Sequence, residues 1–155
     1  MHSRIFQVNT KPIQEVDYIE ESDYWDHWFT REWADYVSDD CDRNDDIGWL
    51  ESCYGKNGIE FGSDDNGEYI IIKSKQEYFA DKFKQYTEVL DKIKQYTLDD
   101  FVNGFHEMWS LKNLYEDKCG FYVDSDDGFM PFDEFVRYCS TETKYYIGGT
   151  LDYHW

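Results

Sequence analysis

The chain has 155 residues, the size of one domain, and carries 34 acidic against 15 basic side chains, for a net charge of -19 at pH 7. Such charge with low hydropathy is typical of disorder, but 20% of the residues are aromatic, and a buried ring removes roughly 150–250 Å² from water. We therefore expect one folded acidic domain over residues 1–155. Its charge repels anionic membranes and nucleic acid itself, and predicts a basic protein partner.

The sequence contains no segment that predicts export or membrane insertion. The first residues have no apolar stretch of signal-peptide length, and no run approaches the ~20 residues that a bilayer requires. We expect a cytoplasmic protein. Wide cysteine spacing excludes zinc ribbons and thioredoxin-type redox motifs and predicts buried free thiols at Cys41, Cys53, Cys119 and Cys139.

A strand and an acidic helix are the first predicted elements. Residues 3–10 carry apolar side chains without helix signals and predict a strand. A helix capped by Ser22 is predicted next, because later apolar residues follow the i, i+3, i+4 spacing of one helical face. These residues are Trp25, Trp28, Phe29, Trp33, Tyr36 and Val37. Residues 39–46 predict a loop, since Asp and Asn cluster there.

A hairpin and two amphipathic helices follow. Residues 58–61 and 68–73 flank a predicted turn at 62–67, and the apolar run at 69–72 indicates an inner strand. Ser74 begins one helix whose apolar residues recur at spacings of three and four. Thr97 begins a second helix, which we expect to continue to Tyr115.

The last third predicts a strand at 121–123, a turn at 124–129 and a short helix that Pro131 begins. Residues 144–155 predict a hairpin that turns at Gly148 and Gly149. Exposed rings at Tyr153 and Trp155 are expected and are compatible with a homodimer. Together the elements predict the α+β class, with about three to four helices packed on a mostly antiparallel sheet.

The negative charge is concentrated in one segment. Residues 15–51 hold fourteen acids against Arg31 and Arg43, a net charge of -12. We predict that at least eight of these carboxylates form one continuous exposed face that binds the partner. The predicted partner-binding residues are Glu15, Asp17, Glu20, Glu21, Asp23, Asp26, Asp35, Asp39, Asp40, Asp42, Asp45 and Asp46.

Catalytic and metal motifs are incomplete in this sequence. An EF-hand alignment over 123–134 places Val123, which cannot ligate calcium, at its first position. The pair His106 and Glu107 lacks a second histidine, because Ser110 stands where the zinc-protease motif requires one. No nucleophile elbow or phosphate-binding loop is present. We therefore predict a non-catalytic chain without metal or cofactor.

In charge and size the chain resembles the phage and mobile-element inhibitors of restriction and CRISPR nucleases that act as DNA mimics. The resemblance rests on composition and on the stretch EVDYIEESDYWDHWFTREWADYVSDDCDRNDD at 15–46. It implies an inhibitor that imitates phosphate charge and blocks a basic nucleic-acid-binding nuclease. Three alternatives stay open: an immunity protein that neutralises a nuclease toxin, a soluble domain whose charge only solubilises it, and a weak calcium binder.

Overall fold

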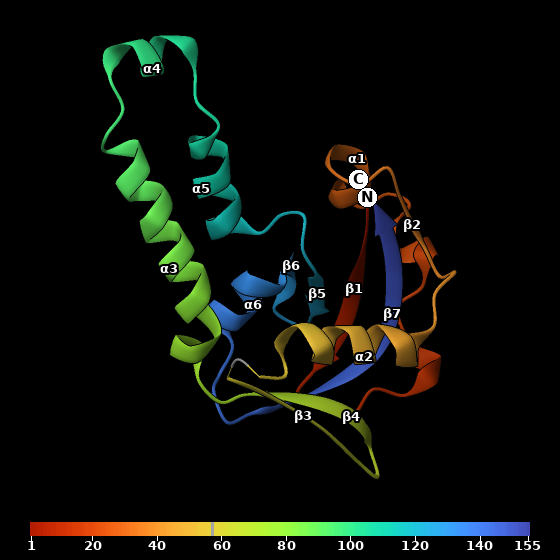
Figure 1. Cartoon of the computed structure of the whole chain (residues 1–155). Helices are drawn as coiled ribbons and strands as arrows, with labels where there is room; N and C mark the ends of the chain where they lie inside the picture. The colour runs from red at the N-terminus through yellow and green to blue at the C-terminus, as the bar shows by residue number, and fades with distance from the viewer. Residues whose placement is uncertain (57) are drawn as a thin grey trace.

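The computed structural model describes residues 1–56 and 58–155 and contains a sheet of seven strands (Figure 1). The order along the sheet is β3-β4-β7-β1-β5-β6, and β2 pairs with β7. Only the β1–β5 pair is parallel among the pairings of the described residues. The strands are β1 (His2–Asn9), β2 (Tyr36–Ser38), β3 (Ile59–Asp64), β4 (Gly67–Ile72), β5 (Tyr122–Ser125), β6 (Gly128–Pro131) and β7 (Lys144–His154).

Helices cover both faces of this sheet. The α-helices are α1 (Trp28–Glu32), α2 (Arg43–Tyr54), α3 (Lys75–Ile93), α4 (Leu98–Asn103), α5 (Glu107–Glu116) and α6 (Phe132–Tyr138), and the 3₁₀ helices are η1 (Glu15–Asp17) and η2 (Glu21–Tyr24). The predicted α+β class and mostly antiparallel sheet are confirmed. The predicted helix number is too low, because the described residues form six α-helices.

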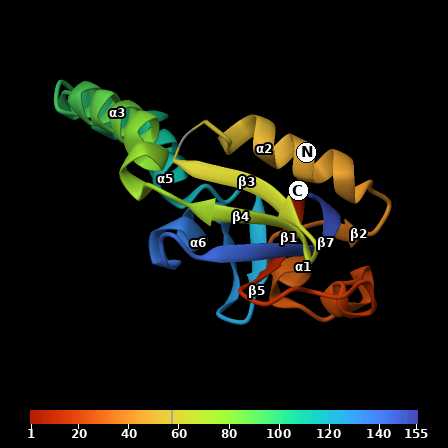
Figure 2. The same cartoon turned by 90° about the horizontal axis from the view of Figure 1, so that it is seen from below.

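Two hydrophobic clusters lie on opposite faces of the sheet, because neighbouring residues of a strand point to opposite sides. Phe6 of β1 packs with α2 and α6, whereas Ile5 packs with Tyr24 of η2 and Phe29 of α1. Figure 2 shows α2 on one side of the sheet and the segment leading to α1 on the other. The acidic segment is therefore divided between two layers.

The predicted helix after Ser22 is wrong. Residues 21–38 form η2, α1 and the strand β2 instead. Phe29 is fully buried, but Trp25 is 72% exposed, so the tryptophans do not form one buried stripe. The backbone N–H of Asp35 donates to the His154 carbonyl, and pairing with β7 thus replaces helical continuation.

The predicted loop at 39–46 is also wrong in its second half. Helix α2 begins at Arg43, and the carboxylate of Asp42 caps it by accepting from the N–H groups of Asn44 and Asp45 at 2.9 and 3.1 Å. Asp45 and Asp46 then lie in the first turn, where acidic side chains are stabilised by the helix dipole. Acidic residues that indicate a loop also begin helices.

The C-terminal hairpin prediction is wrong, because β7 runs without interruption from Lys144 to His154. Gly148 and Gly149 lie instead at a β-bulge against β1, where the pairing register shifts between Phe6 and Val8. A Cβ at Gly148 would lie 2.3 Å from Oε1 of Gln7. The prediction that Tyr153 is exposed is wrong as well, since its side chain is fully buried.

Helices α3, α4 and α5 form an extension away from the sheet (Figure 1). The caps predicted at Ser74 and Thr97 are confirmed, but the second helix is broken at Gly104, where φ is 77°. Nζ of Lys82 in α3 bonds both carboxylate oxygens of the buried Asp133 in α6, each at 2.7 Å. This ion pair connects the extension to the sheet.

The remaining short elements follow the predicted order. β3 and β4 form the predicted hairpin, and the predicted strand and turn near 121–129 become the hairpin β5–β6, which is not an EF-hand loop. All four cysteines are free, as predicted, but only Cys139 is buried, because Cys41 and Cys119 are half-buried and Cys53 is exposed. Within the described residues, no helix is long and apolar enough to cross a membrane.

Candidate functional site: an acidic end and an aromatic cleft

The segments that carry the predicted partner-binding residues, from η1 to the start of α2, lie at the end of the molecule opposite the α3–α5 extension (Figures 1 and 2). Glu15 to Asp35 lie on the layer of η1, η2 and α1, and Asp39 to Asp45 lie around the start of α2 on the other layer. We call the predicted set without Asp46 the acidic end. Its members are Glu15, Asp17, Glu20, Glu21, Asp23, Asp26, Asp35, Asp39, Asp40, Asp42 and Asp45.

Asp46 does not belong to this surface, because its side chain is inside the protein. Asp46 is 3% exposed, and its Oδ1 accepts from Nε of Arg4 at 2.5 Å. Its Oδ2 accepts from Oγ1 of Thr150 at 2.8 Å, and Nη1 of Arg4 also pairs with Asp152. Asp46 therefore connects α2 to β1 and β7 instead of facing a partner.

Most carboxylates of the acidic end have no compensating cation. Asp26 pairs with Arg31 at 3.0 Å and Asp35 pairs with Nδ1 of His154 at 2.9 Å. The other nine have no cationic group within 4.0 Å in the part of the chain that the structure describes. Glu21 is half-buried and the other eight are exposed. Their charge is available to a partner.

Local hydrogen bonds hold several of these side chains in place. Oδ2 of Asp23 accepts from the backbone N–H of Glu20 at 2.9 Å in a reciprocal capping box, and Asp42 caps α2 as described. His27 caps α1 through Nδ1, which accepts from the N–H of Phe29 at 3.3 Å. Partial burial lowers the pKa of His27, so the imidazole adds no positive charge at pH 7.

Gln7 attaches the acidic segment to the sheet. Its Oε1 accepts from the backbone N–H groups of Ile19 and Gly149 at 3.2 and 3.0 Å, and its Nε2 donates to the Asp17 carbonyl at 2.9 Å. The bulge at Gly148 leaves room for this side chain. One amide therefore fixes the backbone between Asp17 and Ile19 against β7.

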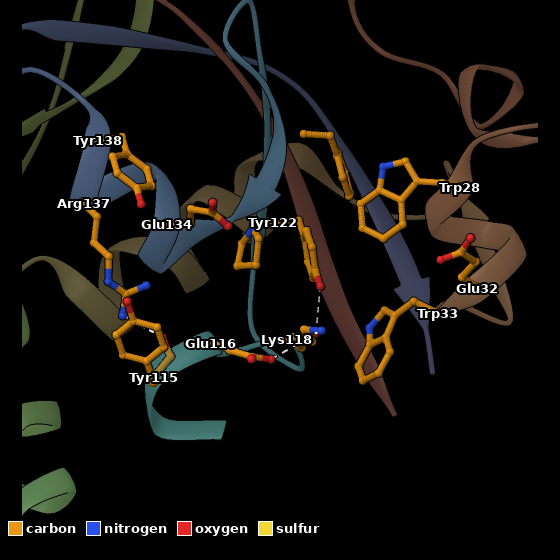
Figure 3. Close-up of a pocket in the computed structure, with 12 residues that line it drawn as sticks. Trp28, Glu32, Trp33, Tyr115, Glu116, Lys118, Tyr122, Glu134, Arg137 and Tyr138 are labelled. Atoms are coloured by element: carbon orange, nitrogen blue, oxygen red, sulfur yellow. Dashed lines mark hydrogen bonds and ion pairs between the residues drawn. The ribbon is translucent and has the colours of Figure 1, made fainter. Parts of the chain in front are cut away.

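An aromatic cleft of about 520 Å³ opens beside the acidic end, between α1, the hairpin β5–β6, α6 and the end of α5. Its rings belong to Trp28, Trp33, Tyr115, Tyr122, Phe129 and Tyr138. Its charged side chains are Glu32, Glu116, Glu134, Lys118 and Arg137. Figure 3 shows Trp28, Glu32 and Trp33 on one side, Arg137 and Tyr138 on the other, and Tyr122 between them.

The two cationic side chains of the aromatic cleft already interact with other residues that line it. Nη2 of Arg137 donates to the Tyr115 carbonyl at 2.6 Å, and its guanidinium lies 4.5 Å from the Tyr115 ring centroid. Nζ of Lys118 lies 3.4 Å from Oε2 of Glu116. Glu32 and Glu134, by contrast, have no cation within 4.0 Å in the described structure. The cleft therefore presents aromatic faces with free carboxylates.

Sequence reasoning located the acidic segment but missed the aromatic cleft and Gln7. Trp28 and Trp33 matched a helical core stripe, and Glu134 is one acid among many. The cleft is assembled from residues about a hundred positions apart, a proximity that no local spacing reveals. A glutamine in a strand likewise carries no signal until a bulge appears opposite it.

Comparisons of the chain with protein families, with curated proteins and with solved structures found no match. The functional inference therefore rests on the geometry and charge described above. The described residues bring no group of three or more His, Cys, Asp or Glu side chains into an arrangement that could hold a metal ion.

Proposed function

We propose that this protein binds a basic nucleic-acid-binding protein through the acidic end and prevents that protein from binding nucleic acid. The observation that carries the proposal is the set of nine acidic-end carboxylates without a cationic partner. Duplex DNA presents one negative charge per ~1.7 Å of its axis, and proteins that bind DNA match that charge with lysine and arginine. An array of uncompensated carboxylates is attractive to the same surface.

The distribution of charge favours recognition over a purely solubilising role. Residues 74–96 hold four acids and five bases, so the excess of acids is not spread evenly over the chain. Uncompensated like charges repel one another and destabilise the fold, a cost that an evenly charged surface would reduce. Their concentration at one end increases the electrostatic attraction toward a basic groove and speeds association.

Preorganisation adds to the affinity that such an array gives. The capping interactions of Asp23 and Asp42 and the attachment by Gln7 hold the backbone of the acidic segment before a partner arrives. A disordered acidic tail would instead lose conformational entropy on binding. The proposed role requires no catalytic group.

Competition with DNA tests the proposal. The protein is immobilised, and proteins that bind it at low salt are captured from a cell extract. The extract comes from the cells that make the protein or from cells that its source infects. Short duplex DNA should displace the retained protein, because both ligands occupy the same basic groove. Displacement by DNA supports the proposal. The identity of the displaced protein then distinguishes the two kinds of inhibitor: a restriction or CRISPR nuclease indicates a DNA mimic, and a nuclease toxin indicates an immunity protein. Complexes that resist excess DNA would contradict it.

A further inference from the structure

We propose that the aromatic cleft binds an arginine side chain, together with its peptide backbone, from the basic partner. This inference rests on the proposed function only for the source of the arginine. The cleft lies beside the acidic end but shares none of its carboxylates, and it is built from rings and carboxylates together. If the cleft binds arginine, the partner is a basic protein that has an arginine in an accessible segment of its chain.

The walls of the cleft suit a guanidinium group. A planar guanidinium stacks on aromatic faces and donates paired hydrogen bonds to a carboxylate. The exposed rings of Trp28 and Tyr138 supply the faces, and Glu134 supplies a carboxylate without a cation within 4.0 Å in the described chain. A lysine ammonium is more strongly hydrated and lacks the planar fork, so arginine is the better occupant.

The protein stacks its own arginine in the same way next to this site. The guanidinium of Arg137 lies 4.9 Å from the ring centroid of Phe79 and 4.5 Å from that of Tyr115, and it donates to a backbone carbonyl. The rings and the carbonyl oxygen around Arg137 thus lie at distances that allow stacking on a guanidinium group and hydrogen bonding to it.

One unpartnered polar atom in the wall of the cleft indicates that a ligand completes it. Among the described residues, Nε1 of Trp33 and Oε2 of Glu116 are the buried side-chain nitrogen and oxygen atoms without a hydrogen bond, and both side chains line this cleft. Oε2 of Glu116 has ion pairs with Nζ of Lys118 at 3.4 Å and Nζ of Lys112 at 4.0 Å, so its charge is compensated. Buried polar groups are normally satisfied, and the Trp33 indole N–H is the one that lacks a partner here.

The chemistry of the cleft is complementary to a peptide that contains arginine. Nε1 of Trp33 can only donate, and a backbone carbonyl of the incoming segment would accept from it. The carboxylates of Glu32 and Glu134 are exposed, and a guanidinium N–H would donate to them. The cleft therefore offers one donor, aromatic faces and two free carboxylates, which match the groups of an arginine residue within a chain.

The test uses a blocked Gly-Arg-Gly peptide and nuclear magnetic resonance of the whole protein. We expect the peptide to shift the Trp33 indole N–H resonance, which the Trp33→Phe variant assigns. The peptide with citrulline, which keeps the shape but not the charge, should bind at least about tenfold more weakly, because the bonds to carboxylate lose their charge. The peptide with lysine should also bind more weakly.

Matched variants separate the cleft from general attraction to an acidic protein. Glu134→Gln should weaken binding of the arginine peptide about tenfold, whereas Glu20→Gln, which removes the same charge at the acidic end, should change it less than about twofold. Equal effects of the two variants, equal binding of the lysine or citrulline peptide, or an unmoved Trp33 resonance would overturn the proposal. This test contains neither DNA nor the partner, so its failure is independent of the competition test.

Discussion

The buried Asp46 illustrates how one side chain can differ in role from its neighbours of the same type. Asp45 is exposed at the start of α2, whereas Asp46 bonds to Arg4 and Thr150 inside the protein. Removing the Asp46 carboxylate would leave Nε of Arg4 and the hydroxyl of Thr150 without their acceptor, and unmade buried hydrogen bonds to a charged group are costly. The charge of Asp46 thus serves stability and not recognition.

Asp46→Ala should lower the free energy of unfolding by about 2–3 kcal/mol, because Nε of Arg4 and Oγ1 of Thr150 lose a buried charged acceptor while Asp152 keeps the guanidinium paired. Urea denaturation at pH 7 measures this change. Asp40→Ala is the matched control: Asp40 is exposed and its carboxylate has no ion pair in the described structure, so its loss should change the free energy by less than about 0.5 kcal/mol. A loss below 1 kcal/mol for Asp46→Ala would show that the Arg4 contacts are not important for stability.

The four thiols should differ sharply in reactivity. Burial raises the pKa of Cys41 and of Cys139 to about 11, and burial also raises that of Cys119, while Cys53 is exposed. At pH 8 a thiol of pKa about 11 is only about one part in a thousand thiolate, the reactive form. One thiol per chain should react rapidly with a disulfide reagent such as DTNB.

Replacement of that thiol provides the control. Cys53→Ser should abolish the rapid phase at pH 8, and reaction of the remaining thiols should accelerate as the pH approaches 11. Several rapid thiols in the unmodified protein, or a rapid phase that persists in Cys53→Ser, would disagree with the partial or full burial of the other three.

At the scale of elements, tertiary pairing decides several structures that local patterns predict incorrectly. The spacing of rings at 25–37 predicts a helix, but pairing of β2 with β7 and burial of Phe29 stop α1 at Glu32. Gly148 and Gly149 predict a turn, but the partner strand β1 continues past them and the glycines accommodate a bulge. Ser74 and Thr97 were predicted correctly, since capping involves only neighbouring residues.

Gln7→Ala should loosen the acidic segment without unfolding the sheet. Its Oε1 accepts from the Ile19 and Gly149 amides, so their hydrogen exchange should accelerate about fivefold if each bond contributes about 1 kcal/mol. Exchange measured by nuclear magnetic resonance checks both amides. Gln14→Ala is the control, because the Gln14 side chain makes no capping bond. Unchanged exchange at Ile19 would show that other contacts position this segment.

At the scale of the whole molecule, the sequence predicts that the chain folds and to which class, but it does not predict where the acids and rings lie in space. The number of rings correctly predicts a folded protein, and the pattern of strand and helix elements correctly predicts its α+β class. The division of those acids between two layers and the aromatic cleft depend on contacts between distant parts of the chain, which composition does not contain.

Added salt should stabilise this protein. The net charge of -19 makes repulsion exceed attraction, and salt reduces the range of both, with a Debye length of about 10 Å at 0.1 M and about 3 Å at 1 M. The thermal midpoint should therefore rise as sodium chloride increases toward 0.5 M. The rise should be smaller in the variant Asp39→Asn/Asp40→Asn/Asp42→Asn/Asp45→Asn, which carries less repulsion. A midpoint that falls with salt would mean that ion pairs dominate.

Binding of this fourfold amide variant to the DNA-displaceable partner tests the acidic end most directly. Asparagine at position 42 keeps the α2 cap, so charge changes without loss of the cap. The control Asp65→Asn/Asp81→Asn/Glu88→Gln/Asp127→Asn removes the same charge from exposed positions elsewhere. We predict that the acidic-end variant binds at least about tenfold more weakly, with a shallower dependence on salt, and that the control binds nearly as well as the unmodified protein. Equal binding by both variants would contradict recognition through the acidic end.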